Sequence, residues 1–394
     1  MCNLACDYCF YLEKHALFPG GRALRMSDDM LERYVREYIA AQPGPEVTFA
    51  WQGGEPTLMG LPFFRKAVDY QRRFAMGKRI SNALQTNGTL LDEAWGAFLK
   101  AEDFLVGISI DGPREVHDRY RVRRDREPSF DQVMRGLEIL QRHGVAYNTL
   151  TCVHAGNARR PLDVYRFLRG IGSRYMQFIP IVERRPQEAE QRLGMQRGGP
   201  PAADAARAED VYSWSVRPDD FGYFMIKIFD RWVRNDVGNV FVQHIDSALG
   251  SWLGVGAGLC VFDETCGRAL AMEHDGSVYA CDHYVYPEFR LGRLGEDSLA
   301  KMADSRRMSA FGDAKRETLP QQCRACAVRF ACNGGCPKHR FTSTASGETG
   351  LNYLCEAYDA FFRHIEPCMR VMAELYRSGR PPAEIMKRVR GGRI

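Results

Sequence analysis

Alternating strand-like and helix-like segments limit the folds that this 394-residue chain can adopt. Five apolar runs have the character of buried strands, at residues 47–51, 80–86, 104–110, 146–153 and 175–182. Amphipathic helical patterns separate these runs, at residues 61–76, 91–101, 130–144 and 162–172. Because parallel strands need crossover connections, which are usually helical, the alternation predicts an α/β fold with a parallel sheet or barrel.

Short motifs follow three of the predicted strands. WQGGEP follows the first strand, TNG the second and DGP the third. In parallel β/α folds, ligands bind beside the carboxyl ends of the strands. We therefore expect a binding site where these motifs meet.

Charge and hydropathy exclude several classes of protein. The net charge of +5 comes from 54 basic and 49 acidic residues spread along the chain, which predicts no nucleic-acid partner and no membrane partner. No apolar run reaches the ~18 residues of a membrane-spanning helix, and no signal peptide precedes the first cysteine, so a cytoplasmic location is expected. Because cytoplasmic thiols stay reduced, the 13 cysteines are expected to bind a metal or a cluster and not to form disulfides.

Three cysteines stand at the start of the chain. Cys2, Cys6 and Cys9, here called the N-terminal cysteines, have a CxxxCxxC spacing that lets one loop bring three thiolates to a common centre. A structural zinc site needs four ligands, which His15 or a distant residue would have to complete. A cubane iron–sulfur cluster held by three cysteines would instead leave one iron open to a small molecule. The spacing alone leaves both sites open.

Most of the remaining cysteines lie in the last third of the chain. They are Cys260, Cys266, Cys281, Cys323, Cys326, Cys332, Cys336 and Cys355. Eight thiols make two sets of four, and each set suits either a fully ligated [4Fe-4S] cluster or a structural zinc site. Cys152, within a predicted strand, and Cys368, on a predicted helix, are interpreted as packing residues.

The chain divides into regions of different character. Residues 184–216 are polar and rich in Gly, Pro and Ala, so they are expected to form a surface excursion, as a lid or a loop. A helical pattern resumes at 219–236, and cysteines and glycines dominate after about residue 258. We predict a core domain at 1–216, a connecting helix and strand region at 217–258, a cysteine-rich domain at 259–370, and a C-terminal helix and tail at 371–394.

These motifs together resemble a known family. CNLACDYCFY followed by WQGGEP resembles the radical S-adenosylmethionine (radical SAM) superfamily, and the cysteine-rich part resembles its SPASM subgroup. Over nearly its full length the chain is most similar to the anaerobic sulfatase-maturating enzymes. The resemblance implies a partial (β/α)6 TIM-type barrel with a C-terminal SPASM domain. Family members carry a leading strand before the first cysteine, and we expect the barrel of this sequence to lack that first strand.

The resemblance also implies a cofactor site. In the family, the N-terminal cysteines hold a [4Fe-4S] cluster whose open iron chelates S-adenosylmethionine, which yields a 5′-deoxyadenosyl radical on one-electron reduction. The residues implied to contact this cofactor are Tyr8, Gly53, Gly54, Glu55, Ser109, Arg121 and Val182. Without the resemblance, GGEP would be interpreted as a turn that ends a strand, and Arg121 as one member of a solvated basic run.

Two further clusters and a base are implied in the cysteine-rich domain, which makes three [4Fe-4S] clusters in all. The first auxiliary set is Cys260, Cys266, Cys281 and Cys336, and the second auxiliary set is Cys323, Cys326, Cys332 and Cys355. The sets interleave in sequence, whereas independent zinc ribbons would use neighbouring pairs. Asp282 directly follows Cys281 and matches the catalytic aspartate of the family, so it is the candidate base; the alternative is a turn residue beside the cluster.

The implied reaction oxidises a Cys or Ser of a sulfatase to Cα-formylglycine without oxygen. Abstraction of a hydrogen atom leaves a substrate radical that must lose one more proton and one more electron, to the base and to an auxiliary cluster. The implied partners are a sulfatase polypeptide with a C/S-x-P-x-R motif and a reducing donor of flavodoxin or ferredoxin type. Two alternatives stay open: another SPASM peptide maturase that forms a thioether or carbon–carbon crosslink, and a non-catalytic zinc-binding module.

Overall fold

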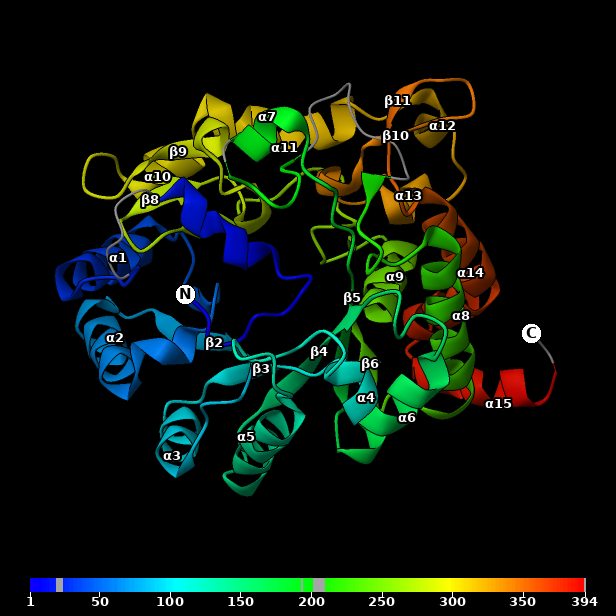
Figure 1. Ribbon diagram of the computed structural model, residues 1–394. Coiled ribbons are helices and arrows are strands. Elements are labelled where there is room, and N and C mark those ends of the chain that lie inside the picture. Colours follow the sequence, from blue (N-terminus) through cyan, green and yellow to red (C-terminus); the bar gives the residue numbers. More distant parts are fainter. Residues whose placement is uncertain (19–23, 193, 201–209, 393–394) are drawn as a thin grey trace.

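The computed structural model describes residues 1–18, 24–192, 194–200 and 210–392. Its main sheet contains β1 (Glu46–Trp51), β2 (Arg79–Thr86), β3 (Leu105–Ser109), β4 (Tyr147–Val153), β5 (Tyr175–Pro180) and β6 (Phe241–Val242). Each strand pairs in parallel with the next one in the chain. No ladder joins β1 to β6 in the described part of the chain, so the sheet is an open, partial barrel, as predicted (Figure 1).

Helices cover the outer face of this sheet (Figure 1). They are α1 (Asp28–Ala41), α2 (Leu61–Phe74), α3 (Glu93–Ala101), α4 (Arg114–His117), α5 (Phe130–Arg142), α6 (Pro161–Gly170) and α8 (Pro218–Asn235). Each long helix is amphipathic; α2, for example, buries Phe63, Phe64, Ala67 and Val68 along one face. This apolar layer packs against the outer face of the sheet. The carboxyl ends of the strands are therefore available for a functional site.

The sequence predicts most of these elements, but it misses α1, the four-residue helix α4 and the position of β6. All five predicted strands and the four helices between them are present. Helix α1 was not predicted, although Ser27 caps its first turn and Leu31, Val35 and Ile39 bury one face at four-residue spacing. Strand β6 lies in the region expected to hold a helix and a strand, but its position was not predicted because two residues carry no periodic signal and only pairing with β5 defines it.

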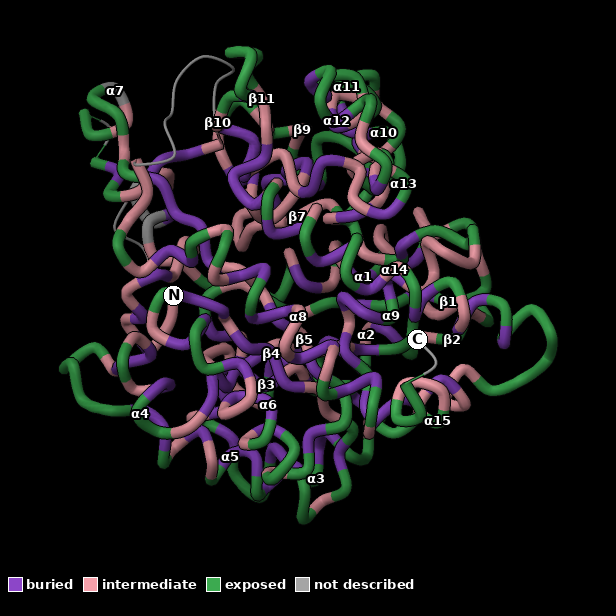
Figure 2. The backbone as a smooth tube through the Cα atoms, turned by 90° about the vertical axis from the view of Figure 1, so that its right-hand side faces the viewer, coloured by how far each residue is buried: buried purple, intermediate pink, exposed green. Residues whose placement is uncertain are grey.

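The C-terminal part adds small sheets and further helices. Strands β7 (Ala271–Met272), β8 (Ser277–Tyr279) and β9 (Arg290–Arg293) form one antiparallel sheet, and β10 (Thr342–Ser343) pairs with β11 (Thr349–Leu351). The helices are α9 (Gln243–Leu253), α10 (Leu299–Ala303), α11 (Arg306–Glu317), α12 (Gln321–Arg324), α13 (Arg329–Cys332), α14 (Cys355–Arg377) and α15 (Ile385–Arg390). Helix α14 packs along α8, and one apolar core contains residues of both helices and of the main sheet. Buried segments accordingly run through both parts of the molecule in Figure 2.

One predicted boundary differs from the structure. Helix α14 continues without a break through residues 370 and 371, so the chain does not divide there. The segment at 184–216 includes the short helix α7 (Glu188–Arg192), while residues 193 and 201–209 lie outside the described part. Several of its described residues, such as Arg185 and Glu188, are exposed, whereas Arg197 donates to the Asp7 carbonyl and Trp214 packs beside the N-terminal cysteines. Among the described residues, no helix has the length and apolar character needed to cross a membrane.

Candidate active site

The N-terminal cysteines lie on a loop that is held against two other segments of the chain. The Ala5 amide donates to the Val122 carbonyl at 2.8 Å, so the loop pairs with the segment that follows α4. Leu4 and Tyr8, which stand between the cysteines, are buried and pack with Ile181 just beyond β5. These apolar residues anchor the loop and place the cysteines beside the carboxyl ends of the strands.

The three thiols on this loop are free and influence one another. Burial raises the pKa of all three, and the charge of Cys9 raises the pKa of Cys2 and Cys6 further. The Arg121 guanidinium acts in the opposite direction on Cys6 and Cys9. Three grouped thiols with a cation beside them fit a cluster held by three thiolates, because bound thiolates are anionic.

Gly53, Gly54 and Glu55 of the GGEP motif lie directly against the start of the cysteine loop. The Glu55 amide donates to the Met1 carbonyl at 2.8 Å, and a Cβ on Gly54 would lie 2.0 Å from that same oxygen. Gly53 has a φ of +137°, which a residue with a side chain rarely adopts. Gly54 therefore allows the close approach of the two backbones, and Gly53 allows the conformation of the turn before it, which favours a site role for GGEP over an ordinary turn.

The Glu55 carboxylate is engaged within the protein and not aimed at a ligand. One oxygen accepts from the Thr57 and Thr86 hydroxyls at 2.6 and 2.7 Å, and the other accepts from the Asn87 amide at 2.7 Å. Burial raises the pKa of Glu55, although these donors oppose the shift. Glu55 thus joins the ends of β1 and β2, and it supports the motif by holding its backbone in place.

We expect Gly54→Ala to reduce the iron bound at the N-terminal cysteines. The added methyl group would overlap the Met1 carbonyl, so the cysteine loop would have to move. Iron content after anaerobic reconstitution measures the effect, and Gly44→Ala is a matched control because its Cβ would meet no atom within 4 Å. Full iron content in Gly54→Ala would show that the close approach is not required.

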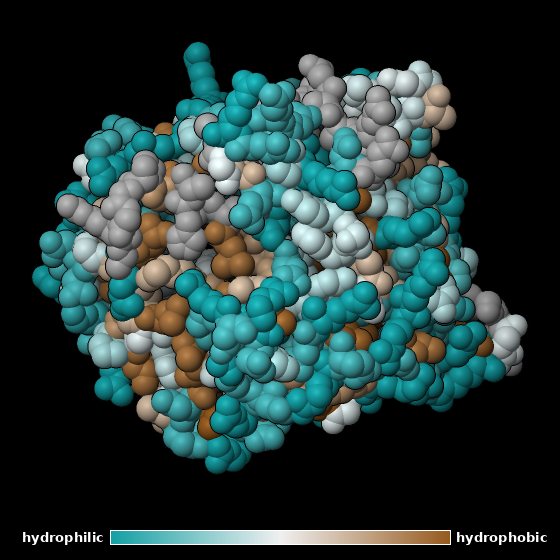
Figure 3. Space-filling model, in the orientation of Figure 1, coloured by the Kyte–Doolittle hydropathy of each residue, from teal (hydrophilic) through white to brown (hydrophobic). Residues whose placement is uncertain are grey.

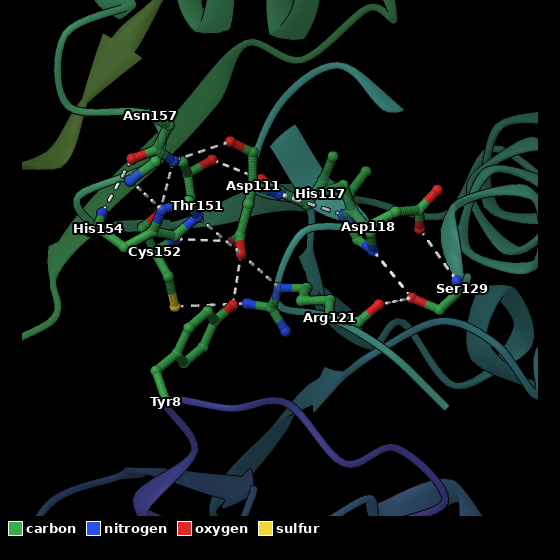
Figure 4. A network of polar contacts seen from close by, with 12 residues as sticks. Tyr8, Asp111, His117, Asp118, Arg121, Ser129, Thr151, Cys152, His154 and Asn157 are labelled. Carbon is green, nitrogen blue, oxygen red and sulfur yellow. Dashed lines mark hydrogen bonds and ion pairs between the residues drawn. The ribbon is translucent and has the colours of Figure 1, made fainter. Parts of the chain in front are cut away.

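A buried polar network surrounds Asp111, the aspartate of the DGP motif (Figure 4). Asp111 lies 3.0 Å from Nε of Arg121, accepts from the Tyr8 hydroxyl, and accepts from the Cys152 amide on β4 at 2.9 Å. Arg121 is 8% exposed, so it does not belong to the solvated run of exposed arginines that follows it. The network therefore joins the cysteine loop to the carboxyl ends of the neighbouring strands β3 and β4.

Asp111 fixes the position of the Arg121 guanidinium. Burial raises the pKa of Asp111, but Arg121 beside it holds that pKa below its ordinary value, so the pair is ionised. The Nη2 atom of Arg121 donates to the Cys152 sulfur at 3.4 Å, and its guanidinium lies 5.6 Å from the centre of the Tyr8 ring. Arg121 and Tyr8 were candidate site residues from the sequence, but Asp111 was not, because its only signal was its place at the end of a strand.

Ser109 and Val182 lie at the same edge of the sheet. Ser109 ends β3 and is 8% exposed, and Val182 lies just beyond β5 and is 2% exposed. Their positions agree with the carboxyl-end rule for ligand sites. Contact with a nucleoside stays a prediction for both residues.

Asp282 begins a short 3-10 helix (Asp282–Tyr284) after β8 and faces the cysteine loop. Its Oδ2 accepts from the Tyr11 hydroxyl at 3.0 Å and from the Gln52 amide at 3.3 Å, and Lys14 donates to its backbone carbonyl. Burial raises the pKa of Asp282, but His283 and the donors around it bring that pKa below its ordinary value. An ionised carboxylate near neutral pH is the state that a base needs.

A cavity of about 930 Å³ connects Gly53, Gly54 and Glu55 with Asp282, while Tyr8, Ser109, Arg121 and Val182 do not line it. Its wall includes Cys2, Gly54, Tyr11, Gln52 and Asp282, together with apolar residues of β1 and α2. Apolar side chains also gather left of centre in Figure 3, on the side of α1 and α2. Small-molecule sites typically measure ~300–1,000 Å³, so this cavity has room for a cofactor and a substrate side chain.

The eight cysteines of the C-terminal part influence one another's pKa within the two expected sets, and their role as cluster ligands stays a prediction. In the first auxiliary set, burial raises the pKa of Cys260, Cys266 and Cys281, and the charge of Cys336 raises it further. In the second auxiliary set, a hydrogen bond with Cys323 and burial raise the pKa of Cys355, and the charges of Cys323, Cys332 and Cys326 raise it further. No three His, Cys, Asp or Glu side chains in the described part converge on one metal ion. A four-iron cluster is larger than one ion, and its sulfur ligands stand farther apart.

Comparison with known families agrees with this geometry. A model of the radical SAM superfamily matches residues 1–168, and a model of the SPASM iron–sulfur cluster-binding domain matches residues 260–327. The matched regions contain the N-terminal cysteine loop, the Asp111 network and Asp282. The resemblance seen in the sequence is therefore confirmed for both halves of the chain.

Similar proteins narrow the family further. The chain is 43% identical to a serine-type anaerobic sulfatase-maturating enzyme of Bacteroides thetaiotaomicron, over 100% of this chain and 94% of the relative. It is 31% identical to a cysteine-type enzyme of Clostridium novyi, over 92% and 91% of the two chains. A solved structure of native anSMEcpe with bound AdoMet and Cp18Cys peptide has a TM-score of 0.81 at 31% identity, over 95% and 96%. The chain therefore belongs to the family of anaerobic sulfatase-maturating enzymes, within the radical SAM superfamily.

Proposed function

We propose that this protein oxidises a Cys or Ser side chain of a sulfatase polypeptide to Cα-formylglycine without oxygen. The observation that carries the proposal is the cavity that joins the N-terminal cysteine loop to the Asp282 carboxylate. Family membership supports the reaction type over the crosslinking maturase and the zinc-binding module. Because both serine-type and cysteine-type relatives match, both side chains are candidate substrates.

The first half of the chain holds the radical-generating cofactor. A [4Fe-4S] cluster on the N-terminal cysteines and S-adenosylmethionine supply, when bound, the radical that abstracts a hydrogen atom from the substrate. Gly54 allows the backbone to lie close to the cysteine loop, and Asp111 orients Arg121 and Tyr8 beside it. Ser109 and Val182, at the carboxyl edge of the sheet, are the candidates to contact the nucleoside.

Asp282 is the base that takes the proton. Tyr11 and Gln52 both donate to its Oδ2, and the His283 amide donates to its Oδ1 at 2.9 Å, so the carboxylate has a fixed orientation. These donors stabilise the ionised form, and the cavity gives a substrate access to it. A positioned, ionised carboxylate of this kind is suited to accept a proton from the oxidised carbon or its substituent.

The second half of the chain supplies ligands for two auxiliary [4Fe-4S] clusters, one on each auxiliary set. Clusters held by these cysteines would supply an acceptor for the electron that the substrate loses, and Asp282 lies next to Cys281 of the first set. A donor of flavodoxin or ferredoxin type supplies the reducing electron for the N-terminal cluster. The cytoplasm, where thiols stay reduced, is the proposed location.

The proposal is tested by anaerobic incubation with S-adenosylmethionine, a reductant and peptides that contain C-x-P-x-R or S-x-P-x-R. Mass spectrometry is expected to show the mass loss of conversion to formylglycine in at least one peptide, with 5′-deoxyadenosine formed alongside. A peptide with Ala at the modified position is the matched control. Release of 5′-deoxyadenosine with every peptide unchanged would contradict the proposal and point to a different peptide substrate.

A further inference from the structure

In the described part of the chain, two buried cations beside the auxiliary sets form no ion pair with a carboxylate. Lys315 on α11 is 1% exposed, and Arg340, between α13 and β10, is 7% exposed. Acidic residues of the surrounding segments pair with other cations: Asp313 and Glu264 with Arg316, and Glu183 with Lys338. Burial of an unpaired charge is costly, so the fold must supply a counter-charge to these two residues.

Lys315 is hydrogen-bonded to the loop that begins the first auxiliary set. Its ammonium donates to the backbone carbonyls of Cys260 at 2.6 Å and Val261 at 3.0 Å, and to that of Asp263. Three N–H groups therefore meet three carbonyl oxygens, which fixes the side chain and the loop together. The bonds satisfy the donors of Lys315 but do not neutralise its charge.

Arg340 is hydrogen-bonded to the loop that connects the two sets. This loop runs from Cys332, a member of the second set, to Cys336, a member of the first. Arg340 donates to the carbonyls of Gly334 at 3.0 Å, Asn333 at 2.8 Å and Gly335 at 3.3 Å.

The backbone of the connecting loop is shaped for this contact. Asn333, Gly334 and Gly335 have φ values of 47°, 72° and 63°, so three consecutive residues adopt the left-handed conformation with their carbonyls bonded to Arg340. The remaining nitrogen of Arg340, Nη1, donates to the Lys315 carbonyl, which links the two cations.

The thiols whose charges act on Lys315 are not the same as those whose charges act on Arg340. Burial lowers the pKa of Lys315, and the nearby thiols that raise it all belong to the first set. Burial also lowers the pKa of Arg340, but the thiols that raise it belong to both sets. Lys315 therefore faces one set, and Arg340 is shared.

We propose that Lys315 and Arg340 are the built-in counter-charge of the auxiliary clusters and that they raise the reduction potentials of those clusters, Lys315 for the first set and Arg340 for both. A cluster ligated by thiolates is an anion that becomes more negative on reduction, so a buried cation nearby stabilises the reduced form. A higher potential favours acceptance of the electron from the substrate. This inference rests on the proposed function, because it takes the two sets as cluster ligands.

The test compares midpoint potentials in full-length chains that lack the N-terminal cluster through Cys2→Ala, Cys6→Ala and Cys9→Ala substitutions. Redox titrations followed by electron paramagnetic resonance are run on this background with Lys315→Gln, Arg340→Gln or Arg316→Gln. We expect Lys315→Gln to shift one of the two auxiliary potentials to more negative values and Arg340→Gln to shift both. Arg316→Gln removes an equal charge from a 41% exposed neighbour and is expected to shift neither.

The outcomes separate this inference from the function it rests on. Fully loaded Lys315→Gln and Arg340→Gln chains with unchanged potentials would overturn the counter-charge role and leave the proposed function intact. If Arg340→Gln binds too little iron to titrate, the Lys315→Gln result decides: one shifted potential supports the role and no shift overturns it. Absence of auxiliary clusters from the background chain itself, after anaerobic reconstitution, would instead refute the ligand assignment.

Discussion

An Asp282→Asn chain is expected to cleave S-adenosylmethionine at close to the native rate while forming almost no formylglycine. Asn has the same size and still accepts hydrogen bonds, for example from Tyr11, but it does not take a proton as a carboxylate does. A positioned base contributes about 10²–10⁴-fold to a rate, so product formation should fall by that factor. Quantification of 5′-deoxyadenosine and of modified peptide in one reaction measures both steps.

The same cavity offers a matched control for this substitution. Asp304 also lines the cavity, but it is exposed and pairs with Arg268 at 2.6 Å, whereas Tyr11 and Gln52 donate to Asp282. Asp304→Asn is expected to retain product formation. Formylglycine at the native rate from Asp282→Asn would remove Asp282 from the role of base and leave it as a hydrogen-bonding residue beside Cys281.

The parts of this structure that the sequence predicts are those with local signals. Apolar runs and helical periodicity predict β1 to β5 and the helices between them, because each pattern lies within one segment. Cysteine spacing likewise predicts the N-terminal loop. Strand β6 carries no such pattern and exists only through its pairing with β5.

The candidate site contains residues that no local signal distinguishes. Tyr11 and Asp282 are 271 positions apart, and Tyr8 and Asp111 are 103 positions apart, yet each pair is hydrogen-bonded. Tyr11 lies in the CNLACDYCFY stretch and Asp111 in the DGP motif, so the sequence motifs contain both residues. The sequence does not show which residues they contact, because the number of possible pairings between distant polar residues is large and only the fold selects among them.

Asp111→Asn is expected to destabilise the protein and to weaken binding of S-adenosylmethionine. The substitution leaves the buried Arg121 guanidinium without its counter-charge, and removal of one partner of a buried ion pair costs about 3–5 kcal/mol. Urea unfolding of the reconstituted protein measures the loss. Asp131→Asn breaks an exposed aspartate–arginine pair, with Arg114, and should cost only about 0–1 kcal/mol.

The stabilising contribution of Asp111 should also depend on pH in one direction. Its pKa in the folded protein lies below the ordinary value of 3.8, so the contribution is fully present above that value and is lost as the pH falls toward the folded pKa. The difference in stability between the native chain and Asp111→Asn should therefore shrink only in acid. An undiminished difference at low pH would show that the Asn side chain destabilises the site for a reason other than charge.

A double substitution separates the structural role of the pair from its role in the site. Asp111→Leu with Arg121→Met removes both charges and fills similar volume, so it should recover much of the stability lost in Asp111→Asn. It should not recover binding of S-adenosylmethionine, measured by equilibrium dialysis, because the guanidinium beside the N-terminal cysteines is gone. Native affinity in the double variant would mean that Arg121 serves the fold alone and is not needed to bind the cofactor.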